Sequence, residues 1–229
     1  MNKTKIEWCD YTWSPVTGCL HNCPYCYARK IANRFKRSDF ISFPLGFIPT
    51  FYYRRLREPQ KIKKPQNTFV CSMADLFGEW VPDEWICKVF EACKKAPQHR
   101  YLFLTKNPKR YIAFAKAGEL PREHWYGWTV TDKSNTHRNS LYPEYNTFVS
   151  FEPLLDDPCY FYNSDKLIGW AIIGAETGNR KNKIIPKREW IETIIANCRE
   201  HNIPIFMKNN LQDIWQDTLI QELPLAGGI

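Results

Sequence analysis

The segment Gly18–Arg29 reads GCLHNCPYCYAR, and its three cysteines follow the spacing C-x-x-x-C-x-x-C. They are Cys19, Cys23 and Cys26. Soft thiolate ligands placed together on one short loop suit either zinc or an iron–sulfur cluster. A 4Fe-4S cluster needs four ligands, so three cysteines leave one iron open for a substrate or cofactor. The alternatives are a zinc site, which normally has four protein ligands and could be completed by Cys9 or His21, and burial without a metal.

The other six of the nine cysteines do not form a group, so we expect one cluster only. They are Cys9, Cys71, Cys87, Cys93, Cys159 and Cys198. Cys87, Cys93 and Cys198 lie at helical spacing among apolar residues, which is typical of core positions. The first ten residues, MNKTKIEWCD, hold no apolar signal core, and no apolar run approaches the roughly 18 residues of a membrane span. We therefore expect a cytoplasmic protein without disulfides.

The composition, with 44% hydrophobic and 24% charged residues among 229, excludes disorder and a coiled coil. Short apolar runs of β-branched and aromatic residues predict buried parallel strands. These runs are Thr68–Cys71, Tyr101–Leu104, Trp125–Val130, Thr147–Phe151, Trp170–Ile173 and Ile203–Met207. Between them, helical spacing after a proline predicts the helices Pro82–Ala96, Pro108–Lys116 and Pro186–His201. The alternation predicts a single-domain α/β protein, namely a partial (β/α) barrel of about six or seven parallel strands.

Polar residues follow nearly every predicted strand. They are Ser72 and Asp75, Thr105 and Lys106, Thr131 and Asp132, Ser150 and Glu152, Glu176 and Thr177, and Lys208 and Asn209. In β/α barrels the active site is built at the carboxyl ends of the strands, where these residues would meet. Capping of the helices that follow is the alternative role for each of them. Their recurrence at almost every strand end favours a functional rim.

The cysteine spacing, with an aromatic residue before the third cysteine, resembles that of radical S-adenosylmethionine (SAM) enzymes. Six further segments are similar, in order, to a phage-associated branch of that superfamily. They are IEWCDYTWSPVTGC, CSMADLFGEWVP, FLTKNPKRY, FVSFEPLL, WAIIGAETG and IPIFMKNN, spread from Ile6 to Asn209. Many members of that branch space the first two cysteines more widely, whereas this chain keeps the tighter spacing of the superfamily.

The resemblance implies that the three cysteines hold a 4Fe-4S cluster after the first barrel strand and that SAM chelates the fourth iron. An electron from a low-potential donor such as flavodoxin or ferredoxin would then cleave SAM to methionine and a 5′-deoxyadenosyl radical. Tyr25 would lie near the adenine. The chain lacks a Gly-Gly-Glu-like segment after the second strand, so Ser72 and Asp75 are the candidates for the amino group. The candidates for the ribose and the carboxylate are Thr105, Lys106, Thr129, Thr131, Ser150 and Glu176.

Glu152 and Lys208 are the candidates for catalysis. Glu152 precedes a proline, which favours extended backbone and would direct the side chain inward. A carboxylate there could bind a ribose hydroxyl or a substrate amine, or transfer a proton. A lysine at a strand end could pair with a carboxylate or a phosphate, and a solvated lysine is the alternative.

The net charge of +8 is concentrated near the N-terminus. Residues 1–64 carry thirteen Lys and Arg against four Asp and Glu, whereas the remainder is close to neutral. Within a basic insertion at about residues 38–65, Arg54, Arg55 and Arg57 follow Phe51, Tyr52 and Tyr53. Basic groups contact phosphates and aromatic rings stack on bases, so this segment predicts binding of a nucleic acid, a nucleotide or another anion. A solvated basic face is the alternative.

The leading hypothesis is therefore a radical SAM enzyme that abstracts hydrogen from a nucleic acid or nucleotide. A second hypothesis, from another class, is a non-enzymatic nucleic-acid-binding protein stabilised by zinc or a cluster. A third keeps the cluster and SAM but places a peptide or a small metabolite in the site.

Overall fold

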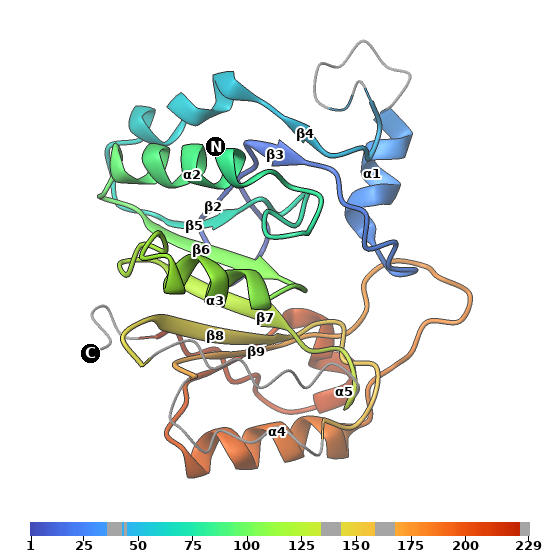
Figure 1. The fold of residues 1–229 in the computed structure, drawn as a ribbon. Helices are drawn as coiled ribbons and strands as arrows, with labels where there is room; N and C mark the ends of the chain where they lie inside the picture. The colour runs from blue at the N-terminus through green and yellow to red at the C-terminus, as the bar shows by residue number, and fades with distance from the viewer. Residues whose placement is uncertain (36–42, 44, 134–142, 159–167, 225–229) are drawn as a thin grey trace.

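The computed structural model describes residues 1–35, 43, 45–133, 143–158 and 168–224, and these form a curved α/β barrel that is not closed (Figure 1). Seven strands pair in parallel in the order β2-β5-β6-β7-β8-β9-β10, and β1 adds antiparallel to β2. The strands are β1 (Asn2–Lys3), β2 (Tyr11–Trp13), β5 (Asn67–Val70), β6 (Arg100–Thr105), β7 (Trp125–Thr129), β8 (Asn146–Phe151), β9 (Ala171–Ile173) and β10 (Ile205–Met207). The predicted fold class is confirmed.

All six predicted apolar runs form strands, with ends that differ by one or two residues. Strand β5 ends at Val70 because Cys71 adopts a left-handed backbone with φ of 58°. The three predicted helices are α2 (Asp83–Lys94), α3 (Lys109–Lys116) and α4 (Arg188–Glu200). The sequence patterns did not predict β2, α1 (Tyr27–Phe35) or α5 (Gln212–Trp215). Helix α1 buries only the small side chains of Ala28 and Ala32, so its apolar stripe is weak.

Alternate residues along each strand belong to two different cores. Tyr101 and Phe103 of β6 face outward and pack with α2 and α3, whereas Leu102 between them faces the inside of the barrel. The inner core consists of Trp8, Cys9, Phe69, Leu102, Trp125, Phe148, Trp170, Ile172 and Phe206. This largely aromatic layer fills the amino-terminal half of the barrel and leaves its carboxyl-terminal half open for polar side chains.

Gly127 makes room for the centre of this inner core. A β-carbon at Gly127 would lie 2.3 Å from the ring of Phe148, which is fully buried. We expect Gly127→Ala to lower the free energy of unfolding by about 1–3 kcal/mol, the usual cost of overpacking. Urea denaturation measures this change. Gly169→Ala, where the nearest atom is 3.3 Å away, is the control and should cost less; equal costs would contradict the prediction.

The described part of the predicted insertion is anchored to the barrel. It contains β4 (Thr50–Phe51), which pairs with β3 (Val16–Thr17), and the 3-10 helices η1 (Tyr53–Arg57) and η2 (Pro59–Lys61). The Phe51 ring stacks on Trp85 of α2, with centroids 5.2 Å apart. The guanidinium of Arg55 donates to the carbonyl of Ser14 at 2.8 Å, which ties η1 to the end of β2.

Cys159 lies outside the described residues, and the other eight cysteines are free thiols. Among the described helices, none has the length and apolar character that crossing a membrane requires.

Candidate functional site

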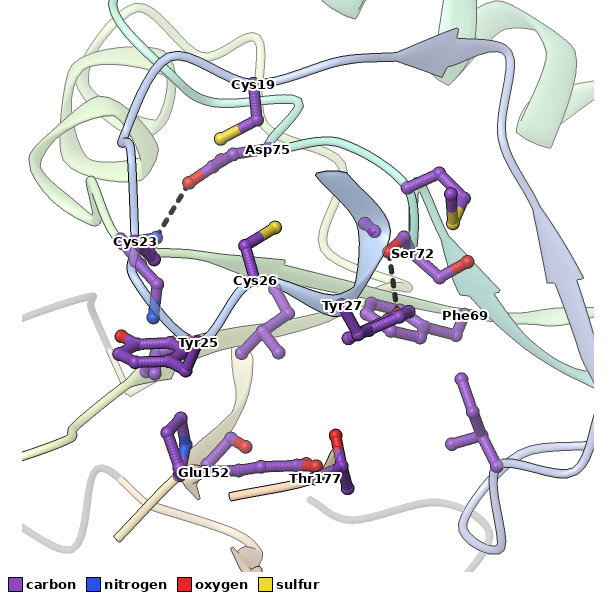
Figure 2. A pocket seen from close by; sticks show the side chains of 18 of the residues that line it. Cys19, Cys23, Tyr25, Cys26, Tyr27, Phe69, Ser72, Asp75, Glu152 and Thr177 are labelled. Atoms are coloured by element: carbon purple, nitrogen blue, oxygen red, sulfur yellow. Dashed lines mark hydrogen bonds between the residues drawn. The ribbon is translucent and has the colours of Figure 1, made fainter. Parts of the chain in front are cut away.

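A cavity of about 520 Å³ opens at the carboxyl ends of the strands (Figure 2). This volume lies within the roughly 300–1,000 Å³ of small-molecule sites. Thirteen of the predicted site residues line it: Cys19, Cys23, Tyr25, Cys26, Ser72, Asp75, Thr105, Lys106, Thr129, Ser150, Glu152, Glu176 and Lys208. Residues far apart in the sequence therefore meet in one chamber because parallel strands end at the same edge.

The three cysteines belong to the loop between β3 and α1 and face this cavity from one side. Burial raises the pKa of the Cys19 thiol to about 12, and the nearby Asp75, Cys23 and Cys26 act in the same direction. The thiols are thus close enough to interact electrostatically. A bound cation favours the thiolate form, so it would oppose the effects of burial and of the nearby acidic groups on this pKa. Within the described residues, no three His, Cys, Asp or Glu side chains meet at one point as ligands of a single metal ion must.

Asp75 ties the cysteine loop to the ends of two strands. Its Oδ1 accepts hydrogen bonds from the Thr105 hydroxyl at 2.7 Å and from the Phe77 amide at 3.0 Å. Its Oδ2 accepts one from the Lys106 amide at 2.9 Å and lies 2.7 Å from Nε2 of His21. A carboxylate has about four acceptor sites, so all of them are engaged. This network favours a positioning role for Asp75, leaving Ser72 as the better candidate for binding an amino group.

The Asp75 network predicts a loss of cluster binding in Asp75→Ala. The change leaves four donors without their acceptor, and we expect the iron content after anaerobic reconstitution to fall severalfold. Iron and sulfide assays measure it. Ser72→Ala is the matched control, because Ser72 lines the same wall but holds no part of the network; it should keep its iron. Full iron content in Asp75→Ala would contradict the positioning role.

Lys106 places a partly buried cation beside the cysteines. Burial lowers the pKa of its ammonium group, whereas Cys23, Asp75, Cys19 and Cys26 act to raise it. Its Nζ lies 5.5 Å from the centre of the Tyr25 ring. The arrangement supplies positive charge at the point where three thiolates would gather.

Three further predicted cofactor residues lie at the ends of β7 and β8 or just beyond them. Thr129 and Ser150 lie side by side because they pair directly between β7 and β8, and both line the cavity. Thr131 does not line the main cavity; it lines an adjoining recess together with Tyr25, Lys106 and Thr129. Its hydroxyl donates to Asp132 at 2.9 Å.

Glu152, which Figure 2 places on the side opposite the cysteines, forms an ion pair with Lys208, another residue that lines the cavity. Gly174 makes this pairing possible. A β-carbon there would lie 2.9 Å from Cδ of Lys208 and 3.3 Å from Cδ of Glu152. The two charged groups, which come from the ends of β8 and β10, can therefore approach each other across β9.

Glu176 is the most deeply buried carboxylate of the cavity, with 1% of its surface exposed. Both of its oxygens accept hydrogen bonds from Arg180, each at 2.8 Å. These bonds lower the pKa of Glu176, so the carboxylate is held in its charged form. A ligand that used Glu176 would have to share it with Arg180.

The three arginines predicted to bind substrate lie elsewhere. Arg54, Arg55 and Arg57 belong to η1, beside α2, and none of them lines the cavity. Tyr27, directly after the third cysteine, also lines the cavity, and its hydroxyl donates to the carbonyl of Ser72 at 2.9 Å. Phe47 is among the lining residues that the sequence patterns missed, because it lies in the insertion, where no periodic pattern marks it.

Solved structures of spore photoproduct lyase share this fold. A complex with dinucleoside spore photoproduct has a TM-score of 0.56 at 10% identity, covering 90% of this chain and 78% of that one. A mutant with bound AdoMet and dinucleoside spore photoproduct has a TM-score of 0.55 at 10% identity, covering 93% and 76%. At such low identity the likeness concerns the fold alone.

Comparison with curated proteins gives no match. A family model described as "Protein of unknown function (DUF5131)" matches residues 3–218, which is nearly the whole chain. The chain belongs to this family.

Proposed function

We propose that this chain is a radical SAM enzyme, with a 4Fe-4S cluster held by Cys19, Cys23 and Cys26 and SAM bound in the adjoining cavity. The observation that carries the proposal is the placement of all three cysteines on one wall of a 520 Å³ cavity at the open end of a partial barrel. Bound together, the cluster and SAM supply a 5′-deoxyadenosyl radical that abstracts hydrogen from the substrate. The bound AdoMet in one spore photoproduct lyase structure of similar fold supports this assignment.

The donor set suits a cluster better than a single zinc ion. A structural zinc ion normally takes four protein ligands, whereas three cysteines on a 4Fe-4S cluster leave the fourth iron for SAM. Lys106, partly buried beside the thiols, would offset their negative charge and attract the carboxylate of SAM.

Other cavity residues would bind and orient SAM. Ser72 is the candidate for the amino group, and the hydroxyls of Thr129 and Ser150 are candidates for the ribose. Tyr25, beside Lys106, would contact the adenine. Asp75 would hold the loop in place, and Glu152 with Lys208 would orient SAM and the substrate from the opposite wall.

The substrate is proposed to be a nucleic acid or a nucleotide. The basic residues concentrated in the first 64 positions support an anionic substrate. The dinucleoside photoproduct bound in the structures of similar fold points the same way. A low-potential donor such as flavodoxin or ferredoxin would supply the electron, and a reducing compartment such as the cytoplasm would suit the free thiols. The single-domain organisation, the role of the three η1 arginines and the phage-associated branch stay predictions.

Anaerobic reconstitution with iron and sulfide tests the proposal. We expect a brown protein with about four irons per chain, because one 4Fe-4S cluster fills the cysteine loop. Incubation with SAM and dithionite should release 5′-deoxyadenosine, detected by chromatography and mass spectrometry. A colourless protein that retains one zinc and leaves SAM intact would instead favour the zinc-stabilised nucleic-acid-binding protein.

A further inference from the structure

We propose that the mouth of the cavity, formed by α1 and the segment 177–187, binds a single-stranded segment of nucleic acid. This inference rests on the proposed function, because it takes the cavity as the place of reaction. It assigns substrate binding to a surface other than the arginines of η1.

Exposure identifies the mouth. Among the described residues that line the cavity, only Tyr27 and Thr177 are exposed to solvent. Tyr27 begins α1, and Thr177 follows β9. The ammonium group of Lys30 lies 4.0 Å from the position of a β-carbon on Gly178, so the two segments are neighbours in space. Figure 1 shows the orange segment after β9 reaching the start of α1.

Both sides of the mouth carry positive charge. Lys30 and Arg34 are exposed on α1, and Lys181 and Lys183 are exposed on the facing segment. Neither Tyr27–Phe35 nor 177–187 contains an acidic residue. Within the described part of the chain, none of these four groups forms a salt bridge with a carboxylate, and Lys183 acts on Glu176 only at longer range. Four cations without a salt bridge beside one opening favour a polyanion, because each can neutralise a phosphate and release its counterion.

Apolar side chains stand beside these cations. Tyr27 is 44% exposed and Ile31, one helical turn later, is 36% exposed, while Ile185 across the mouth is 68% exposed. The hydrogen bond from Tyr27 to Ser72 holds its ring at the rim. Single-strand binding proteins combine such surfaces with basic groups, since bases stack on rings while the backbone follows the charge.

The reaction also requires a base or sugar to leave any duplex. The cavity lies behind the rim, and its interior accommodates a small molecule rather than a double helix. An acidic electron-donor protein would also be attracted by the four cations. Such a donor protein, however, would not insert any group into the cavity between Tyr27 and Thr177. Its docking would also not require an aromatic ring at the rim.

Fluorescence anisotropy with a fluorescein-labelled single-stranded oligodeoxynucleotide tests the proposal on the reconstituted full-length protein. Two variants reverse the charge of the mouth, Lys30→Glu/Arg34→Glu and Lys181→Glu/Lys183→Glu. We expect each to weaken binding by about tenfold or more and to reduce the salt dependence, because phosphate contacts are lost. The matched control Lys94→Glu/Lys95→Glu makes the same charge change on exposed positions of α2 and should bind within about twofold of the wild type.

Three results would overturn the inference. The first is binding that persists in both mouth variants but is lost in Arg54→Glu/Arg57→Glu. The second is a wild-type chain that binds neither single-stranded DNA nor single-stranded RNA, or that prefers duplex. The third is unchanged oligonucleotide binding with a selective loss of flavodoxin-driven SAM cleavage, which would identify a donor surface. SAM cleavage by the wild type with dithionite and no nucleic acid is measured separately, so failure of the proposed function is recognised independently.

Discussion

Cys23→Ala should reduce SAM cleavage to the background of protein without iron, the largest effect expected for any single substitution. Removing one of three thiolates leaves two ligands in a loop that has no other cysteine lining the cavity among the described residues. A cluster with two protein ligands is lost or degraded on purification. Iron and sulfide content, the visible absorption of the cluster and 5′-deoxyadenosine release with dithionite are the three measurements.

Cys87→Ala provides the matched control for this loss. It makes the same change of thiol to methyl on α2, away from the cavity, and should retain full iron and full activity. The comparison also separates the two metal hypotheses. If the loop holds zinc, both proteins lack iron and Cys23→Ala alone loses zinc. Reductive cleavage of SAM that survives in Cys23→Ala would remove the cysteine loop from the active site.

The barrel strands could be predicted because a strand that is buried on both faces has apolar residues at consecutive positions. In β8, for example, Phe148 and Val149 point to opposite sides and are both fully buried, one in the inner core and one against the outer layer. The pattern of apolar runs did not predict strand β2. This strand has only three residues, of which Trp13 alone is buried, so it contains no apolar run.

Most of the polar residues that line the cavity could also be predicted, since the carboxyl ends of parallel strands lie at the same edge of the sheet. The hydrogen-bond partners of these residues could not be predicted. Glu176 was expected to face a ligand, yet Arg180, four residues later in a segment without helical structure, occupies both of its oxygens. Likewise, the position of Asp75 gave no sign of its bonds to Thr105 and His21, which depend on how separate loops come together.

The three arginines of η1 illustrate the limit of charge patterning. They directly follow the aromatic residues Phe51, Tyr52 and Tyr53, which suggested a stacking surface. In the fold Arg55 makes structural contacts instead. Its guanidinium donates a hydrogen bond to the carbonyl of Ser14 and lies 4.1 Å from the centre of the Tyr52 ring. Charge density along the chain predicts an anionic partner, but it does not tell which basic residues lie near the cavity; that depends on the fold.

Glu152→Gln should slow SAM cleavage by about 10- to 100-fold, the usual effect of losing a charged hydrogen-bonding group, while iron content stays unchanged. The reason is position: Glu152 and Lys208 pair on the wall opposite the cysteines, so they can orient a bound molecule without touching the cysteine loop. The rate of 5′-deoxyadenosine formation and the iron content are measured on the same preparation. Glu192→Gln, which breaks the exposed ion pair with Arg188 on α4, is the control and should change neither value.

A double substitution decides whether the pair is needed for catalysis or only for folding. Lys208→Met alone leaves the Glu152 carboxylate without its cation in a partly buried site and should destabilise the chain. In Glu152→Gln/Lys208→Met no charge is left unpaired, so stability should return toward the wild-type value in urea denaturation. If the pair orients the reacting molecule, cleavage stays slow in this stable double variant. Recovery of the rate together with stability would show that the pair serves the fold alone and would exclude Glu152 from the chemistry.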